Sequence, residues 1–283
     1  MPTAISPLLP IGAGRTVHKT YPAISAAQSI GMGGSTGNLT PRPGGLDYAD
    51  ITQGLFGGGG ATTSVRTFRG TAAIRLTDTG AAGEGAFIGF TDRFTPMIEA
   101  NDAPFHTADV NCLSFAAILG GEFTADATQD VGLQLVAGGP AGGGEVFAGN
   151  TSGIQFGPRG PARVSLRVRL VNGGALTVDT DVAAGFMANI NPNHWNEYEM
   201  RIIGAAQGTA AVLKCLVNGI QVIPDVSFAA AAALLPGVVK VGAPNNGSIG
   251  YVGTVVNLWS AASPALDMYR MSLYLGPNET SLL

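Results

Sequence analysis

The sequence is poor in charged residues, and this shortage excludes one class of partner. Only 12% of its 283 residues are charged, and the formal net charge is −4. A chain with so few cations has no basic surface that could release counterions from DNA or RNA, so we expect no nucleic-acid partner. A surface of low charge instead favours a protein whose faces are covered by neighbouring subunits.

Long hydrophobic runs are also missing. The most apolar stretch, residues 228–235, is short, rich in alanine and ended by Pro236. A membrane-spanning helix needs about 18 or more such residues, so we expect no membrane association. The chain starts at Met1 without a basic segment followed by an apolar one, which argues against a cleaved secretory signal.

Cysteine is scarce as well. Cys112 and Cys215 have no CxxC partner and no histidine at metal-binding spacing. Each lies in an apolar, strand-like run, where a buried free thiol acting as a small hydrophobic group is expected. A disulfide between them stays open as the alternative and would require their Cα atoms to lie close together.

Glycine and proline are abundant and indicate many turns. The chain has 42 Gly and 17 Pro, while its hydrophobic fraction of 46% is ample for a folded core. Both residues crowd into residues 1–60, where no helix or strand periodicity persists, so we predict a long irregular N-terminal arm. Large apolar residues recur along it and need a surface to contact. The candidate assembly anchors of this arm are Leu8, Leu9, Ile11, Tyr21, Tyr48 and Phe56.

Residues 61–283 show short β-like runs separated by Gly, Pro and Asn. The clearest is 163–171, where valine and leucine alternate strictly with arginine and serine, as in a strand with one buried face. Residues 195–202 alternate again and place Tyr198, Met200 and Ile202 inward. The strongest hairpin signal is 212–217, Asn218-Gly219 and 220–222. Further strands are predicted at 71–76, 85–90, 112–119, 131–136, 175–181, 238–241, 250–258 and 268–275.

These strands carry a resemblance to a known superfamily. The run His-Trp-Asn-Glu-Tyr-Glu-Met-Arg-Ile-Ile from His194, followed by the strand ending in Leu-Val-Asn-Gly and its return strand, resembles concanavalin A-like lectin/glucanase and laminin G-like jelly rolls. The closing run 267–275 resembles the last core strand of that superfamily. Independently, period-two strands without helices need two sheets to bury their apolar faces. We therefore predict an all-β, two-sheet antiparallel jelly-roll-like sandwich over residues 61–283.

The chain departs from the glucanases of this superfamily at the residues that carry catalysis. Those enzymes place their acid pair on one strand as Glu-x-Asp-x-x-Glu. The nearest match here is Glu197-Tyr-Glu199, and Ile202 stands where the third acid would be. We interpret the two carboxylates beside Arg201 as a solvated strand face and expect no catalytic residues and no enzyme activity.

No cofactor or metal site is expected either. His18, His106 and His194 are too far apart in sequence to form a site by spacing alone. The aspartate pairs 126/130 and 179/181 supply too few oxygens for calcium by themselves. The glycine-rich stretches lack the Gly-Lys-Ser/Thr continuation of a phosphate loop.

Two tryptophans remain as candidates for carbohydrate stacking. Trp195 precedes an inward-alternating strand, and the resemblance implies that it packs near the core. Trp259, at the end of an apolar run, is the better sugar-stacking candidate.

The sequence leads to three functional hypotheses. The first is a structural component of a large assembly, a bacteriophage virion protein such as a capsid decoration, minor capsid or tail-associated subunit. Its partners would be other copies of itself and other virion subunits, contacted through the arm, and its location the extracellular particle after synthesis in the host cytoplasm. The second is a carbohydrate-binding module on a phage fibre or bacterial surface. The third, disfavoured by the missing acid, is a glycoside hydrolase or lyase on the same sandwich. Deleting residues 1–56 is expected to leave a folded sandwich that no longer assembles.

Overall fold

The computed structural model describes residues 17–21, 37–38, 51–56, 62–77, 85–90, 112–122, 130–137, 152–158, 164–169, 176–181, 191, 193–203, 211–228, 251–257, 265–276 and 279. All regular structure in these ranges is β-strand, which confirms the predicted all-β class. Within the same ranges no helix is long and apolar enough to cross a membrane.

Sheet A holds eight of the described strands, in the order β14-β13-β12-β7-β16-β5-β4, with β1 also paired to β16. Every pairing in it is antiparallel. The strands are β1 (Val17–Tyr21), β4 (Thr62–Phe68), β5 (Thr71–Thr77), β7 (Cys112–Glu122), β12 (Asn196–Ile203), β13 (Ala211–Val217), β14 (Ile220–Phe228) and β16 (Ala265–Gly276).

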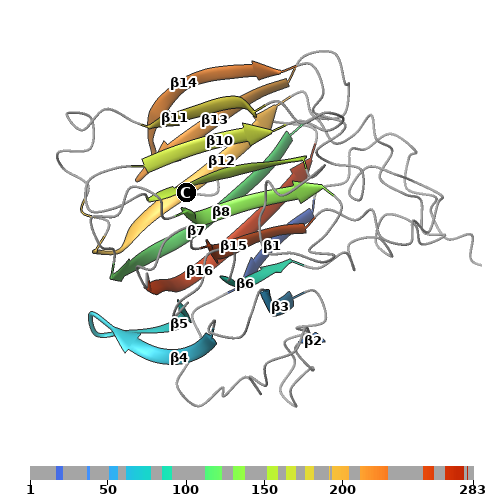
Figure 1. Ribbon diagram of the computed structural model, residues 1–283. Coiled ribbons are helices and arrows are strands. Elements are labelled where there is room, and N and C mark those ends of the chain that lie inside the picture. The colour runs from blue at the N-terminus through green and yellow to red at the C-terminus, as the bar shows by residue number, and fades with distance from the viewer. Residues whose placement is uncertain are drawn as a thin grey trace, which may run out of the picture.

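Sheet B holds the other eight described strands, in the order β11-β10-β9-β8-β15-β6-β3-β2, again antiparallel throughout. Its strands are β2 (Gly37–Asn38), β3 (Ile51–Phe56), β6 (Gly85–Phe90), β8 (Asp130–Ala137), β9 (Ser152–Pro158), β10 (Val164–Arg169), β11 (Leu176–Asp181) and β15 (Tyr251–Asn257). The two sheets lie one behind the other in Figure 1, with β12 in contact with β8 and β9 and β5 in contact with β6 and β15.

The core lies between the sheets and follows the alternation of β12. Tyr198, Met200 and Ile202 are fully buried, as predicted. Tyr198 meets Phe156 of β9 edge to face, with ring centroids 6.0 Å apart, so this face of sheet A points at sheet B. The neighbouring strand β7 lines the same face with Leu113 and Phe115, which are also fully buried. Burial of large apolar side chains of this kind contributes about 1.5–3 kcal/mol each.

Two hairpins of sheet A close through two-residue turns with positive φ at both positions. Asn218 and Gly219, with φ of 50° and 77°, join β13 to β14, as the Asn-Gly signal predicted. Arg69 and Gly70, with φ of 47° and 80°, join β4 to β5. This second turn is not evident from the sequence, because arginine rarely adopts the left-handed region.

The strand β16 is long enough to pair with two different strands along one edge. Residues Ala265–Met268 pair with β5, and residues Met271–Leu275 pair with β1. A register shift between Met268 and Arg270 against β7 makes Tyr269 the extra residue of a bulge. The bulge lets Asp267 and Arg270 share one face of the sheet although they are three residues apart.

The first sixty residues contribute strands to both sheets, a feature that the predicted irregular arm did not include. The strand β1 pairs with β16, and β2 and β3 extend the edge of sheet B through β6. The partners of β1 are 250 or more positions away in sequence, as in Val17 opposite Leu275, so no local pattern indicates the pairing. Among the candidate anchors, Tyr21 ends β1 and Phe56 ends β3. Leu8, Leu9, Ile11 and Tyr48 lie outside the described residues.

Both cysteines are free and buried, as expected. They lie on opposite faces of sheet A, because Cys215 pairs with the inward-facing Met200 while Cys112 pairs with Ile203 of the other face. Burial raises the pKa of the Cys215 thiol well above its ordinary value, so this sulfur is an unreactive core group.

Candidate functional site

The face of sheet A that points away from sheet B carries an unusual density of polar side chains, and we call it the outer face. Side chains alternate along a strand, so residues opposite in parity to Tyr198 belong to it. Four of its buried side chains are polar, namely Ser114 of β7, Glu199 of β12, and Asp267 and Ser272 of β16. Buried polar groups need hydrogen bonds or ion pairs, so this face is the candidate location of a functional site.

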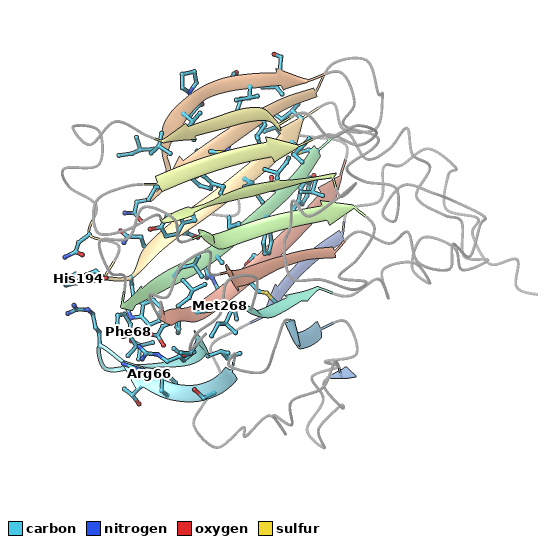
Figure 2. All side chains as sticks on the ribbon, in the orientation of Figure 1. Arg66, Phe68, His194 and Met268 are labelled. Carbon is cyan, nitrogen blue, oxygen red and sulfur yellow. The ribbon has the colours of Figure 1, made fainter. Side chains whose placement is uncertain are left out.

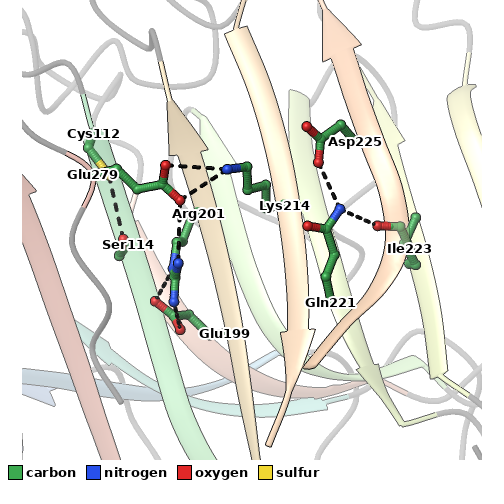
Figure 3. A network of polar contacts seen from close by, with 9 residues as sticks. All are labelled: Cys112, Ser114, Glu199, Arg201, Lys214, Gln221, Ile223, Asp225 and Glu279. Carbon is green, nitrogen blue, oxygen red and sulfur yellow. Dashed lines mark hydrogen bonds and ion pairs between the residues drawn. The ribbon is translucent and has the colours of Figure 1, made fainter. Parts of the chain in front are cut away.

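The predicted solvated face around Glu199 is wrong. Its side chain is 0% exposed, and that of Arg201 is 12% exposed. The guanidinium makes a bidentate contact, with Nε donating to Oε1 at 2.7 Å and Nη2 donating to Oε2 at 2.8 Å (Figure 3). These hydrogen bonds raise the pKa of the arginine above its ordinary value. Alternation along a strand gives the face on which a residue lies and not its exposure, which is why the sequence interpretation failed here.

A second bidentate pair lies farther along the face, between neighbouring strands. Arg75 of β5 donates from Nε and Nη2 to the two oxygens of Asp267, at 2.9 and 2.7 Å. Arg66 of β4 lies 3.6 Å from the same carboxylate. The Asp267 side chain is fully buried. Removing either arginine would leave a buried charge underpaired, which is strongly destabilising.

Glu197 lies on the same face in a more open position. Its side chain is 22% exposed, and Oε1 is 3.5 Å from Nη2 of Arg270. Burial raises the pKa of the Glu197 carboxyl, Arg270 lowers it, and nearby Glu199 raises it further. Glu197 and Glu199 are thus the two acids noted in the sequence, and each contacts an arginine of the outer face.

An aromatic group adjoins these ion pairs at one end of the sheet. It consists of Phe68 at the end of β4, Trp195 just before β12, and Tyr269 in the bulge of β16. The Trp195 ring meets Phe68 edge-on at 5.0 Å and Tyr269 at 6.0 Å between ring centroids. Phe68 is buried, whereas Trp195 and Tyr269 are partly exposed. The indole Nε1 of Trp195 is buried and finds no hydrogen-bond partner in the structure as described.

Arginines and a glycine complete the surroundings of this aromatic group. The guanidinium carbons of Arg66 and Arg69 each lie 5.6 Å from the Phe68 ring centroid. Figure 2 shows Arg66, Phe68 and His194 near one another at this end of the molecule. Beneath the ring lies Gly120 of β7, where an added Cβ would approach Phe68 Cε1 to 2.6 Å. The aromatic ring therefore depends on the absence of a side chain at position 120.

Hydrogen bonds hold the loop that carries Trp195. The backbone carbonyl of Asn191 accepts from the backbone N–H of His194 at 2.9 Å and from Nδ2 of Asn196 at 2.8 Å. The Asn191 side chain accepts from the backbone N–H of Asn193 at 3.0 Å. Arg69 of the β4–β5 turn donates to the Asn193 carbonyl at 2.8 Å. The loop and the turn thus position the indole from two sides.

The structure brings together some residues that the sequence indicated and adds others. Trp195 packs at the rim of the outer face, while Trp259 lies outside the described residues. Phe68 and Tyr269 were not predicted, because they come from strands far apart in the sequence and only sheet pairing brings them to Trp195. In the described part of the chain no three His, Cys, Asp or Glu side chains form a group that could hold a metal ion.

Comparison with known proteins supports the fold and does not identify the function. No protein-family model matches the sequence, and no curated protein matches it. The structure resembles that of the protein of unknown function SO2946 from Shewanella oneidensis MR-1, at 12% identity over 100% of both chains with a TM-score of 0.52. Peanut lectin matches at 10% identity over 94% of this chain and 100% of its own, with a TM-score of 0.45. The CBM2 module of the evolved Dit of Lactobacillus casei BL23 phage J-1 matches at 9% identity over 83% of this chain and 94% of its own, with a TM-score of 0.44. The chain is an antiparallel jelly-roll-like sandwich.

Proposed function

We propose that this chain is a carbohydrate-binding jelly roll whose ligand lies on the outer face of sheet A at Trp195 and Tyr269. The observation that carries the proposal is the partly exposed pair of aromatic rings, whose centroids lie 6.0 Å apart. Sugars present C–H surfaces that pack on aromatic rings and hydroxyls that accept hydrogen bonds.

The neighbouring ion pairs support binding rather than catalysis. The two Glu199 oxygens accept from Arg201, and Glu197 contacts Arg270. The partly exposed Glu197 and Arg270 offer an acceptor and donors to sugar hydroxyls, whereas the buried Glu199 holds Arg201 in place. We therefore keep the non-enzymatic role as part of the proposal.

Glycan binding by four variants tests the proposal. Wild-type protein screened on immobilised oligosaccharides should bind at least one class, and Tyr269→Ala and Trp195→Ala should each weaken that binding about tenfold or more, which corresponds to about 1.4 kcal/mol. Trp195→Phe keeps a ring and removes only the N–H, so its loss should be smaller. Trp259→Ala is the matched control and should bind as wild type does.

The same variants distinguish the two tryptophans. If Trp259→Ala abolishes binding while Trp195→Ala and Tyr269→Ala, checked by circular dichroism for folding, bind normally, the ligand site is not on the outer face. Absence of binding to every glycan class, by a protein that is folded and monodisperse, would remove the carbohydrate proposal altogether.

A role as a phage virion subunit stands as the second proposal. Its support is compositional, namely a charged fraction of only 12% and an N-terminal segment rich in apolar residues, Gly and Pro. The partners would be copies of this chain and other virion proteins, and the location the extracellular particle. A carbohydrate-binding subunit of a phage fibre would satisfy both proposals. Truncations of the N-terminal segment test the assembly role.

A further inference from the structure

One carboxylate of the outer face comes from beyond the last strand. Glu279 follows the end of β16 at Gly276, yet it contacts Arg201 of β12 and Lys214 of β13. In the sheet order β13-β12-β7-β16, these strands lie two and three places away from β16. Arg201 and Lys214 are opposite each other in the register, so both cations belong to the outer face. The Glu279 carboxylate therefore contacts two cations of β12 and β13, strands that are not neighbours of β16 in the sheet (Figure 3).

The two carboxylates around Arg201 are held very differently. Glu199 is fully buried and receives hydrogen bonds of 2.7 and 2.8 Å. Glu279 is 37% exposed and receives longer ones, 3.3 Å from Nη1 of Arg201 and 3.2 and 3.3 Å from Nζ of Lys214. Charge-assisted hydrogen bonds of full strength measure about 2.7–2.9 Å, so Glu279 is the loosely held anion. An ion pair with this much exposure contributes little to stability.

The cations that Glu279 covers are well suited to bind a carboxylate from another molecule. Arg201 is positioned by its bidentate contact with Glu199, and its Nη1 points away from that contact toward Glu279. The Lys214 side chain is 26% exposed. A planar guanidinium fixed by a second carboxylate next to an ammonium forms a preorganised anion site.

This site lies on the same strand face as the aromatic group. Trp195 and Arg201 are six residues apart with the same parity, which corresponds to about 20 Å along the strand direction at roughly 3.3 Å per residue. The intervening Glu197 and Glu199 both contact arginines. Glu199, between them, is fully buried, so a ligand would approach the Arg201–Lys214 pair from the side where Lys214 and Glu279 are exposed.

We propose that Arg201 and Lys214 form a subsite for the carboxylate of an acidic sugar, and that Glu279 occupies this subsite as an intramolecular stand-in for it. The inference rests on the proposed carbohydrate-binding function and names its ligand class, a glycan that contains uronic acid. Binding of such a glycan requires displacement of Glu279, so the Glu279 side chain lowers affinity for acidic ligands and leaves neutral ones unaffected.

The test compares an acidic and a neutral hexasaccharide, hexagalacturonate and maltohexaose, on the full-length chain by calorimetric titration. Glu279→Gln should bind hexagalacturonate about tenfold more tightly than wild type and should bind maltohexaose unchanged. Glu279→Asp keeps the competing charge and should resemble wild type. Asp225→Asn removes one negative charge from the exposed β14 edge, where Asp225 contacts only Gln221 among the printed contacts, and serves as the control for net charge.

Removal of one of the two cations tests the same subsite from the other side. Lys214→Gln in the Glu279→Gln background should abolish the gain, and added salt should reduce it, because the attraction is electrostatic. Three results would overturn the subsite. The first is an equal gain in hexagalacturonate affinity in Asp225→Asn, and the second is an equal gain in affinity of Glu279→Gln for a hexaglutamate peptide. The third is no gain in a folded Glu279→Gln protein that still binds glycans through Trp195. If neither wild type nor Glu279→Gln binds any oligosaccharide, the carbohydrate-binding function itself fails and the subsite fails with it.

Discussion

Tyr198 combines the largest fully buried side chain of the described core with an unsatisfied polar atom. Its ring packs edge to face on Phe156, while its hydroxyl is buried without a hydrogen-bond partner among the described residues. Burial raises the pKa of this phenol, so the group stays neutral at all ordinary pH values. A buried hydroxyl without a partner costs about 1–3 kcal/mol relative to water.

Tyr198→Phe is therefore expected to stabilise the protein. The substitution keeps the ring contacts and removes the desolvated hydroxyl, so the free energy of unfolding should rise by about 1 kcal/mol, measured by urea denaturation. Tyr198→Leu, which removes the ring, should instead lower it by about 1–3 kcal/mol. A loss of stability in Tyr198→Phe would show that the hydroxyl has a hydrogen-bond partner.

Sequence alternation predicts side-chain direction well at this scale and predicts environment poorly. Tyr198, Met200 and Ile202 were expected inward and are buried. Glu199 was expected in water and is fully buried, because Arg201 on the same strand neutralises it. The pattern of a single strand contains no information about what covers its second face.

At the scale of elements, the Asn218-Gly219 turn links the β13–β14 hairpin to the start of β12. Asn218 adopts a φ of 50°, and its Oδ1 accepts from the Glu197 backbone N–H at 2.9 Å. Its Nδ2 donates to Asn196 Oδ1 at 3.0 Å, and its backbone N–H donates to the Glu197 carbonyl at 2.8 Å. One side chain therefore closes a hairpin and anchors the strand that carries the outer-face acids.

Two substitutions separate these two contributions. Asn218→Gly keeps the positive φ and loses only the side-chain hydrogen bonds, so it should lower the free energy of unfolding by about 1 kcal/mol. Asn218→Ala loses the hydrogen bonds and also strains the backbone, and should cost about 2–3 kcal/mol in total. Chemical denaturation of both proteins provides the comparison. Equal losses in the two variants would mean that the turn conformation carries no strain for alanine.

Strand pairs joined by a short turn can be predicted from this sequence, whereas pairs of strands that are distant in sequence cannot. The Asn218-Gly219 signal identified the β13–β14 hairpin, which the structure contains. The pairing of β1 with β16 and the meeting of Phe68, Trp195 and Tyr269 depend on strands that are distant in sequence. The candidate site was therefore indicated by Trp195 and the adjacent acids, without the residues that complete it.

At the scale of the whole molecule, the N-terminal sixty residues connect the fold to the proposed assembly role. Their described strands pair with this chain's own sheets, β1 along Met271–Leu275 and β3 along the whole of β6. Backbone groups satisfied in this way support the sandwich itself. The expectation that deleting residues 1–56 leaves the body intact must accordingly be revised.

Two truncations distinguish support of the fold from contact with neighbours. Removing residues 1–56 deletes β1, β2 and β3 and exposes the backbone edges of β16 and β6, and exposed edges promote aggregation. We expect the free energy of unfolding to fall by about 3 kcal/mol and the melting temperature by roughly 6–12 °C, measured by calorimetry.

Removing residues 1–16 is the matched control, since it deletes Leu8, Leu9 and Ile11 and leaves β1 and all later strands in place. This shorter truncation should melt close to wild type. If it also fails to join an assembly that the full chain forms, as measured by sedimentation, the anchors act between subunits. If it assembles normally while the longer truncation melts like wild type, the N-terminal segment neither tethers subunits nor supports the sandwich.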